Sequence, residues 1–237
     1  MKDYRGLGTS PEAEIVAGPR AALEVLRAGK RAVRRLILGR QEAGATIETI
    51  LGLARTRQVP VETRPREELD RVVHGATHQG VLLEVGPFPY AEPEALVAQA
   101  SQGPVPGFLL ALDGIQDPQN LGAIIRSAEA AGVHGCILPR DRAVGVTAAA
   151  VRASAGATEH LAIAQVTNLA ALLKYVKSQG FWVVGADSTE GRDLFAADLT
   201  DPLVLVIGGE ERGLRPRTRG ARGCSRTNPR GLRARSS

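Results

Sequence analysis

Two short stretches of this 237-residue sequence combine residue types that could do chemistry. The first, DPQNLGAIIRSAEAAG at residues 117–132, starts as a turn and continues as a helix that we expect to begin at Asn120. The Asn120 side chain can cap free backbone N–H groups, and Gly122 lets a ligand or another backbone approach the first turn. Arg126 stands among Ile, Ala and Ser, on a helix that is otherwise small and apolar, where it could face a ligand. The alternative is an arginine that extends into solvent.

The second stretch, GGEERGL at residues 208–214, follows the apolar run PLVLVI. A glycine-rich loop after a strand can cradle a phosphate. The Gly-Lys-Ser/Thr of a P-loop is missing, however, and Glu210 stands at the third position of the dinucleotide-binding pattern, which requires a glycine there. A carboxylate would repel a pyrophosphate, but it suits a cationic cofactor or hydroxyl donors. The alternative is a tight turn that happens to contain a glutamate.

The elements around both stretches predict a parallel sheet. Apolar strands alternate with helices, and strands that are apolar along their whole length are covered on both faces. Ligands bind beyond the carboxyl ends of the strands in such a sheet, so both stretches are expected at its functional edge. The expected strands are FLLALD (108–113), GCIL (135–138), LAIAQV (161–166), FWVVGAD (181–187) and LVLVIGG (203–209).

The N-terminal third predicts a separate small α/β unit. A helix opens at Gly18-Pro19 and closes at Gly29, and GVLLEV (80–85) reads as a buried strand. Five prolines and three glycines then fall within residues 86–107, which indicates a linker that contains a short helix. The expected organisation is a small α/β domain at 1–86, a linker at 87–106, a ligand-binding domain at 107–214 and a tail at 215–237.

Charge is concentrated in that tail. The chain carries a net charge of +5, yet residues 215–237 hold eight arginines and no acid. The folded body is therefore slightly acidic, and the high pI is weak evidence that it binds nucleic acid. The tail composition cannot bury a core face, so we expect it to be disordered. No apolar run reaches about 18 residues, Cys136 is expected in the core, and the histidines have no metal-ligand spacing; neither a membrane span nor a metal is expected.

Taken together and in this order, the two stretches resemble the first and second motifs of the SpoU/TrmH family of RNA ribose 2′-O-methyltransferases, within the SPOUT superfamily. GATHQGVLLEV (75–85) is similar to the end of the substrate-binding domain in the branch that modifies ribosomal-RNA guanosines. The resemblance covers residues 15–214. It implies a trefoil-knotted parallel sheet, S-adenosylmethionine as cofactor, large-subunit ribosomal RNA as partner, a homodimer and a cytoplasmic location.

The resemblance also assigns roles in the reaction. Arg126 matches the arginine that activates the ribose 2′-hydroxyl, either as a base of lowered pKa or as a cation that clamps a phosphate and stabilises the alkoxide. We prefer the second role because arginine is normally protonated. Asn120 and Glu210 would orient Arg126 and the ribose. The residues that match cofactor contacts are Gly208, Gly209, Gly213 and Ala186.

The N-terminal unit resembles a ribosomal-protein-like RNA-binding fold, in which His78 and Gln79 match an HQG signature. The alternative for His78 is a histidine at a strand start whose ring is satisfied by the backbone. A basic cluster between helix and strand could meet phosphates, or it could be a solvated turn. The cluster consists of Lys30, Arg31, Arg34 and Arg35, and the last two are the RNA-binding candidates.

The chain departs from the family after Pro216. The family continues with a third motif, Ser-Leu-Asn-x-Ser, which closes the cofactor pocket, whereas residues 217–237 read RTRGARGCSRTNPRGLRARSS. A reading-frame error or truncation near residue 216 is the preferred interpretation, and a genuine basic arm for RNA is the alternative. We therefore expect an incomplete knot, weak or absent cofactor binding and a damaged dimer interface. An RNA-binding protein without turnover is the second functional hypothesis. A nucleotide-binding α/β protein is the third, and the missing phosphate motifs disfavour it.

Overall fold

The computed structural model describes residues 13–40, 42–73, 77–186, 192–193, 199–209, 213–216, 218 and 226–228. The chain forms two compact units, which we call unit 1 and unit 2. Unit 1 comprises residues up to Pro89 together with Leu121–Arg126 and Val146–His160. Unit 2 comprises Tyr90–Asn120, Ser127–Gly145 and the residues from Leu161 onward.

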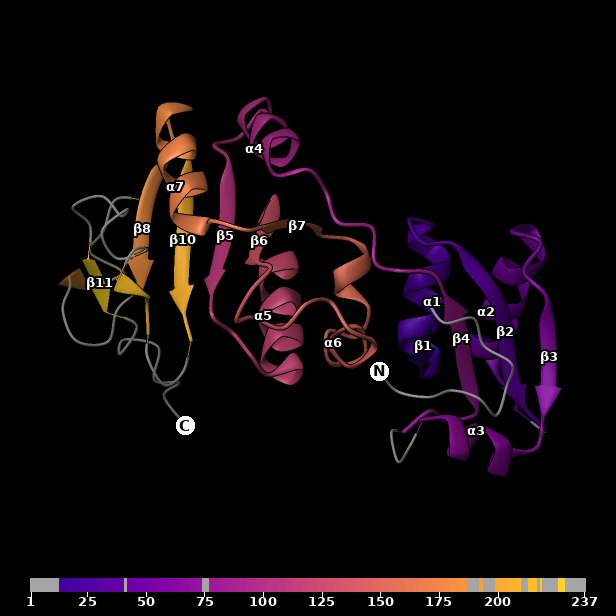
Figure 1. Cartoon of the computed structure of the whole chain (residues 1–237). Helices are drawn as coiled ribbons and strands as arrows, with labels where there is room; N and C mark the ends of the chain where they lie inside the picture. The colour runs from indigo at the N-terminus through magenta and orange to yellow at the C-terminus, as the bar shows by residue number, and fades with distance from the viewer. Residues whose placement is uncertain are drawn as a thin grey trace, which may run out of the picture. The chain divides into compact units, whose positions relative to one another are not determined.

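Unit 1 is built on a four-stranded sheet of order β1-β4-β2-β3 (Figure 1). β4 is antiparallel to both β1 and β2, whereas β2 and β3 are parallel, with a helix between them in the chain. The sequence pattern predicted β4 but missed β1, whose four residues are too few to show a period. The strands are β1 (Glu14–Ala17), β2 (Val33–Gly39), β3 (Val61–Arg64) and β4 (Val81–Val85).

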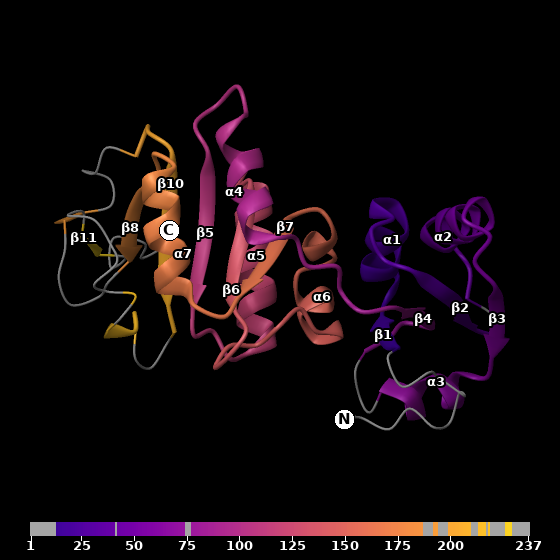
Figure 2. The ribbon, with the colours of Figure 1, turned by 45° about the horizontal axis from the view of Figure 1, so that its top comes forward.

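Three helices cover this sheet: α1 (Pro19–Ala28), α2 (Ala45–Thr56) and α3 (Arg66–Val73). Figure 2 shows α1 and α2 above the strands and α3 below them. α1 begins at a proline and ends at Gly29, whose φ of 65° is left-handed, as the sequence predicted. Leu69 and Val72 of α3 pack against one apolar face of the sheet that includes Ile37 and Leu82.

Residues 146–160 complete unit 1 with helix α6 (Ala148–Ala153) and the short 3-10 helix η2 (Ala157–Glu159). Part of α5 (Pro118–Ala130) belongs to the same unit, and its Gly122 lies directly against α6. A Cβ atom at Gly122 would lie 2.5 Å from Ala153 Cβ and 2.7 Å from the carbonyl oxygen of Ala150. The two helices can approach this closely only because position 122 has no side chain.

We therefore expect Gly122→Ala to lower the free energy of unfolding by about 1–2 kcal/mol, because overpacking outweighs the gain in helix propensity. Gly52→Ala is the matched control, since Gly52 is also helical, is exposed and would place its Cβ in open space. This control should raise the free energy of unfolding by about 0.5–1 kcal/mol. Urea unfolding followed by circular dichroism measures both, and equal shifts in the two variants would contradict the packing argument.

A buried polar cluster joins η2 to the rest of unit 1. The Arg31 side chain is fully buried and donates from Nη2 to the Gly86 carbonyl at 2.7 Å and to Glu14 at 2.5 Å. Its Nη1 lies 3.5 Å from Oε1 of Glu159, which is also fully buried. Nη1 of Arg31 and both Glu159 oxygens make no hydrogen bond with the residues that the structure describes. Burial raises the pKa of Glu159, although the Arg31 charge opposes that shift.

Unit 2 contains the parallel sheet that the sequence predicted. Its strand order is β7-β6-β5-β10-β8-β11-β9, and every described pair in it is parallel. The main strands are β5 (Phe108–Asp113), β6 (Gly135–Pro139), β7 (Ala162–Val166), β8 (Trp182–Ala186) and β10 (Leu203–Gly208). Two short strands, β9 (Arg192–Asp193) and β11 (Arg226–Asn228), extend one edge.

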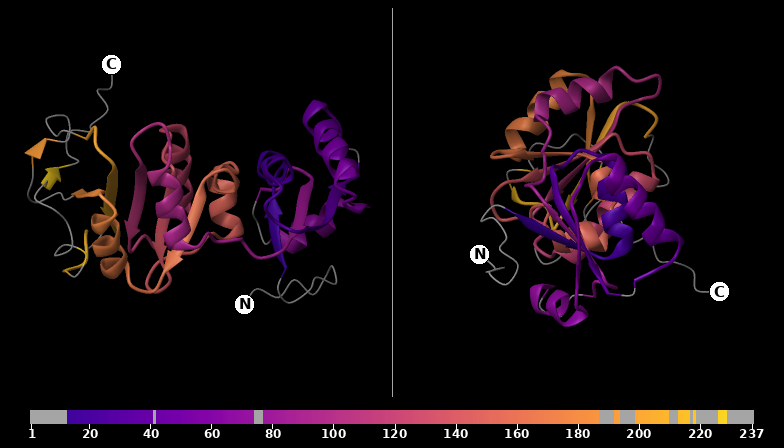
Figure 3. Two further views of the ribbon diagram at one scale, coloured as in Figure 1. Left: turned by 90° about the horizontal axis from the view of Figure 1, so that it is seen from above. Right: turned by 90° about the vertical axis from the view of Figure 1, so that its right-hand side faces the viewer.

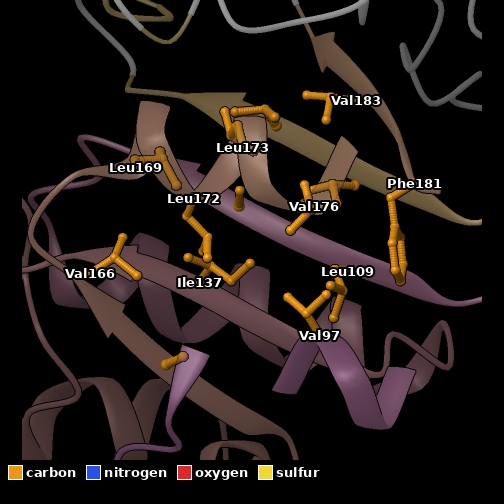
Figure 4. Packing of buried hydrophobic residues seen from close by; sticks show 14 of the residues in the cluster. Val97, Leu109, Ile137, Val166, Leu169, Leu172, Leu173, Val176, Phe181 and Val183 are labelled. Carbon is orange, nitrogen blue, oxygen red and sulfur yellow. The ribbon is translucent and has the colours of Figure 1, made fainter. Parts of the chain in front are cut away.

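One face of this sheet is covered by α4 (Pro93–Ser101) and α7 (Leu169–Ser178) (Figure 3). Figure 4 shows how Leu172, Leu173 and Val176 of α7 meet apolar side chains of the strands and Val97 of α4. Asn168 caps α7 by accepting a hydrogen bond from the amide of Ala171, as predicted. The expected core position of Cys136 is confirmed, and burial raises the pKa of its thiol to about 12, so it is not a nucleophile.

The start of α5 differs from the prediction. The helix begins at Pro118, and its N-cap is Asp117, whose side chain accepts from the Gln119 amide. Proline at the first helical position needs no N–H partner, so Asp117-Pro118 starts the helix before Asn120 is reached. Asn120 is the third helical residue and not its cap.

Most of the expected tail lies outside the described residues, as does the segment on which the expected knot depends. Residues 226–228 are described and form β11, whereas the composition predicted no secondary structure there. Within the part of the chain that the structure describes, no helix is long and apolar enough to cross a membrane. Among those same residues, no group of three or more His, Cys, Asp or Glu side chains could hold a metal ion.

Candidate functional site

The strand order of unit 2 creates one topological switch point. From β5 the chain proceeds to β6 and β7 on one side, and it returns to β8 and β10 on the other. β5 and β10 are therefore neighbours whose outgoing connections diverge, which opens a crevice at their carboxyl ends. The two sequence stretches follow these two strands, and Asp113 pairs with Gly208 at the last position of both.

A cavity of about 980 Å³ lies at this edge, within the size range of small-molecule sites. Four segments of unit 2 line it: the turn after β5, the loop after β6, the start of α7 and the residues that follow β10. The described lining residues are Asp113, Gly114, Gln116, Arg142, Thr167, Asn168, Leu169, Ala170, Gly209, Gly213, Leu214, Arg215, Pro216 and Thr218.

Two of these residues present bare backbone to the cavity. Gly114 has a φ of 92° and Gly213 a φ of 59°, both in the region that disfavours a side chain. An added Cβ would meet only the Arg142 carbonyl oxygen at 3.9 Å from Gly114, and nothing within 4 Å from Gly213. A flat ligand ring can therefore lie against the main chain at these positions.

Backbone hydrogen bonds connect the residues that follow β10 to the end of β5. The Gly209 amide donates to the Asp113 carbonyl at 3.0 Å, and the Gly213 amide donates to the Gly209 carbonyl at 2.8 Å. Gly208 allows this fold-back, because a Cβ there would lie 2.1 Å from the carbonyl carbon of Gly213. Of the stretch GGEERGL, the described residues Gly209, Gly213 and Leu214 line the cavity, and the Gly209–Gly213 hydrogen bond brings its two ends together.

Asp113 is a site residue that the sequence reasoning missed. Its carboxylate is fully buried at the end of β5 and accepts hydrogen bonds from both the backbone amide and the Nε of Arg215. The available signal was an acidic residue that ends an apolar strand at the ligand-binding edge of the sheet. Such a residue requires a partner when it is buried, and here the partner is 102 positions away.

The expected cofactor residues divide into two groups. Gly209 and Gly213 line the cavity. Gly208 and Ala186 end β10 and β8 and are not among its described lining residues. Glu210 lies outside the described residues, so its orienting role stays a prediction.

Arg126 and Asn120 both lie on α5. Arg126 is exposed, and within the described residues it has no ion-pair partner. Asn120 is partly buried. Arg126 belongs to unit 1, whereas the cavity belongs to unit 2. The convergence of Arg126 with the cofactor pocket therefore stays a prediction.

The HQG signature forms the turn before β4. His78 is buried, its Nδ1 accepts from the Gly80 amide at 3.1 Å, and its Nε2 therefore donates to Asp70 at 2.8 Å. This geometry favours the alternative that His78 is satisfied within the fold. Gln79 is exposed with a φ of 48°, at the tip of the turn, so it is the member of the pair that could contact RNA.

The four residues of the basic cluster also differ in whether they are held within the fold or exposed. Lys30 donates to the carbonyl of His160 at 3.1 Å, and Arg31 is buried. Arg35 is partly buried and pairs with Glu84 at 2.5 Å and Glu62 at 3.0 Å. The hydrogen bond from Arg35 is the main reason that the pKa of Glu62 is lowered. Arg34 is exposed and, of the four, is the one best placed for phosphate contact.

A parallel sheet with a glycine-walled cavity at its switch point defines an α/β protein that binds a small cofactor, here preceded by a separate sheet domain. Residues 107–223 match the SpoU rRNA Methylase family, and residues 15–91 match the RNA 2′-O ribose methyltransferase substrate-binding family. The chain belongs to the SpoU/TrmH family of RNA methyltransferases, which confirms the resemblance of its motifs. The SpoU rRNA Methylase match ends at residue 223, nine residues beyond residue 214, where the resemblance was expected to end.

Relatives and solved structures agree with this assignment. YacO of Bacillus subtilis, named as a TrmH family tRNA/rRNA methyltransferase, is 38% identical over 205 residues, which is 86% of this chain and 82% of YacO. A tRNA/rRNA methyltransferase of Mycobacterium ulcerans is 40% identical over 207 residues, and the alignment covers 87% of this chain but 66% of that protein.

Among solved structures, the SpoU methyltransferase AviRb from Streptomyces viridochromogenes, in complex with AdoMet, superposes with a TM-score of 0.75 at 24% identity. That superposition covers 98% of this chain and 88% of AviRb. A TrmH family protein from Porphyromonas gingivalis superposes with a TM-score of 0.71 at 26% identity, over 92% of this chain and 80% of that one.

Proposed function

We propose that this chain transfers a methyl group from S-adenosylmethionine to a ribose 2′-hydroxyl of RNA. The observation that carries the proposal is the cavity at the β5–β10 switch point, which is lined by residues of the second family motif and by the turn that precedes the first. AviRb, which has the same fold, was crystallised with AdoMet, and the family is one of RNA methyltransferases. We further propose a guanosine of large-subunit ribosomal RNA as the substrate, a homodimer as the working form and the cytoplasm as its location.

The described cavity suits this cofactor. Gly114 and Gly213 offer bare backbone against which an adenine ring can lie, and Leu169 and Leu214 supply apolar walls. No lysine lines the described part of the cavity, so its described residues lack the P-loop lysine that binds a nucleoside triphosphate. When bound, S-adenosylmethionine supplies the methyl group from its sulfonium centre.

The remaining chemistry falls to Arg126. A ribose hydroxyl must lose its proton as it attacks, and the developing alkoxide needs a positive charge beside it. Arg126 is exposed, and a guanidinium is a cation with five donors, so we assign it the role of clamping the RNA and stabilising that oxygen. Asn120 and Glu210 would orient the ribose and the guanidinium. In unit 1, Arg34, Arg35, His78 and Gln79 stay candidates for RNA contact, with Arg34 and Gln79 the most accessible.

A second candidate function is RNA binding without turnover. It is favoured by the residues that follow Pro216, where the third family motif is replaced by an arginine-rich segment. Loss of that motif would leave the substrate-binding surfaces intact and the cofactor pocket incomplete.

Transfer of a tritiated methyl group to ribosomal RNA tests the proposal. We expect Arg126→Ala to lower kcat by about 10²–10³, because it removes the charge that stabilises the alkoxide. Arg55→Ala is the matched control, since Arg55 is also an exposed helical arginine and lies on α2, and it should change kcat little. A wild-type chain that transfers no methyl group but still retards ribosomal RNA on a gel would support the second candidate instead.

A further inference from the structure

The ion pair between Asp113 and Arg215 leaves most of the arginine available. Oδ2 of Asp113 accepts the backbone amide of Arg215 at 2.9 Å, which by itself anchors the turn after β10. Among the residues that the structure describes, Oδ1 accepts a hydrogen bond from the Nε of the Arg215 side chain and from no other group. A guanidinium has five N–H donors in a rigid fork. Within the described part of the chain, the two Nη groups of Arg215 donate to no acceptor, so their four donors can serve a ligand.

The environment of Arg215 favours an anionic ligand. Its side chain is about one-third exposed, although the carboxylate that holds it is fully buried. Arg142 is exposed and lines the same cavity from the loop after β6. Asp113 neutralises one of these two arginines, so the described lining residues carry one net positive charge. A planar fork held at a cavity mouth suits bidentate contact with an oxyanion.

We infer that Asp113 is a positioning residue that holds Arg215 at the mouth of the cofactor cavity, where Arg215 binds a phosphate of the RNA substrate. The inference rests on the proposed function, and it adds an RNA contact on unit 2 that the family motifs do not assign. The exposure of Arg142 and the partial exposure of Arg215 favour an RNA phosphate over the carboxylate of the cofactor, which would be enclosed.

Asp113→Asn is the decisive variant because the two explanations predict opposite changes in RNA affinity. One explanation is an effect of overall charge, and the other is the positioning of Arg215. Removing a negative charge beside RNA should tighten binding if only overall charge matters. If Asp113 positions Arg215, the same change should weaken binding about two- to fivefold, because an amide holds the guanidinium less firmly than a carboxylate does. Fluorescence anisotropy with a labelled single-stranded RNA of about 20 nucleotides measures this, since phosphate contacts do not depend on sequence.

Arg215→Gln should weaken the same RNA about three- to tenfold and reduce the slope of log K against log salt concentration by about 0.7, the value for one phosphate contact on a single strand. Arg215→Lys keeps the charge and should retain most of that slope. Lys177→Gln is the matched control, because it removes one exposed positive charge at the far end of α7 and should leave the slope unchanged.

Calorimetry with S-adenosylhomocysteine distinguishes the two oxyanions that Arg215 could bind, an RNA phosphate and the carboxylate of the cofactor. If Arg215→Gln weakens that ligand and not RNA, the subsite holds the cofactor carboxylate and the RNA assignment is overturned. If Asp113→Asn tightens RNA and Arg215→Gln changes neither ligand, the positioning role is overturned while the proposed function stands. A wild-type chain that binds neither probe would overturn both. Circular dichroism of each variant excludes unfolding as the cause.

Discussion

Arg31→Met should lower the free energy of unfolding by about 3 kcal/mol, because it leaves the buried carboxylate of Glu159 without its cationic partner. Glu159 is fully buried, and Arg31 is the cation that lies 3.5 Å from it. Methionine fills much of the volume of arginine but offers no charge and no donor to the Gly86 carbonyl. Adding Glu159→Gln to this variant should restore about 1–2 kcal/mol, because the uncompensated charge is then gone. Urea unfolding of the single and double variants gives the coupling between the two positions.

The pair of Arg31 and Glu159 also makes the free energy of unfolding depend on pH. Burial raises the pKa of Glu159, so the folded state binds the Glu159 proton more tightly than the unfolded state does. The contribution of Glu159 to stability is therefore full below its ordinary pKa and is lost as pH rises through the raised value. Arg31→Met removes the opposing charge and should raise that pKa further. The cost of the substitution should thus be largest near pH 8 and shrink towards about pH 5, and a cost that does not change with pH would count against a charged Glu159.

Gly208→Ala should lower the free energy of unfolding by about 2–3 kcal/mol and disrupt the cavity wall. The new Cβ would lie 2.1 Å from the carbonyl carbon of Gly213 and 2.4 Å from the Leu214 nitrogen. Both atoms belong to the backbone, so the turn as a whole must move. That movement would break the Gly213–Gly209 hydrogen bond and displace the Arg215 amide from Asp113.

Gly103→Ala is the control for that variant. Gly103 also lies in unit 2, and its added Cβ would meet the Val105 carbonyl oxygen at an ordinary 3.6 Å. Its free energy of unfolding should stay within about 0.5 kcal/mol of the wild type. Thermal and urea unfolding compare the two alanine variants, and a Gly208→Ala protein as stable as Gly103→Ala would show that the turn after β10 can shift without cost.

The secondary structure was predictable where a local pattern carries the information. The apolar strands β5, β6, β7, β8 and β10 were expected from their composition, and the caps of α1 and α7 from Gly29 and Asn168. The start of α5 was misplaced because Asn120 resembles a cap, while the preceding Asp117-Pro118 pair starts the helix earlier. β1 was missed because it becomes a strand only through its pairing with β4.

The sequence alone determined the family, the parallel sheet and the two loops at its functional edge, because each of these depends on short contiguous segments. Only the tertiary structure decided which charged residues face solvent. Arg31, Arg34 and Arg35 are similar neighbours in the sequence, yet their surroundings differ. Arg31 is buried beside Glu159, Arg34 is exposed, and Arg35 pairs with Glu84 on a neighbouring strand. Asp113 and Arg215 likewise meet only because β5 and β10 are neighbours. A buried charge must find its partner wherever the fold brings one, and no local period records that pairing.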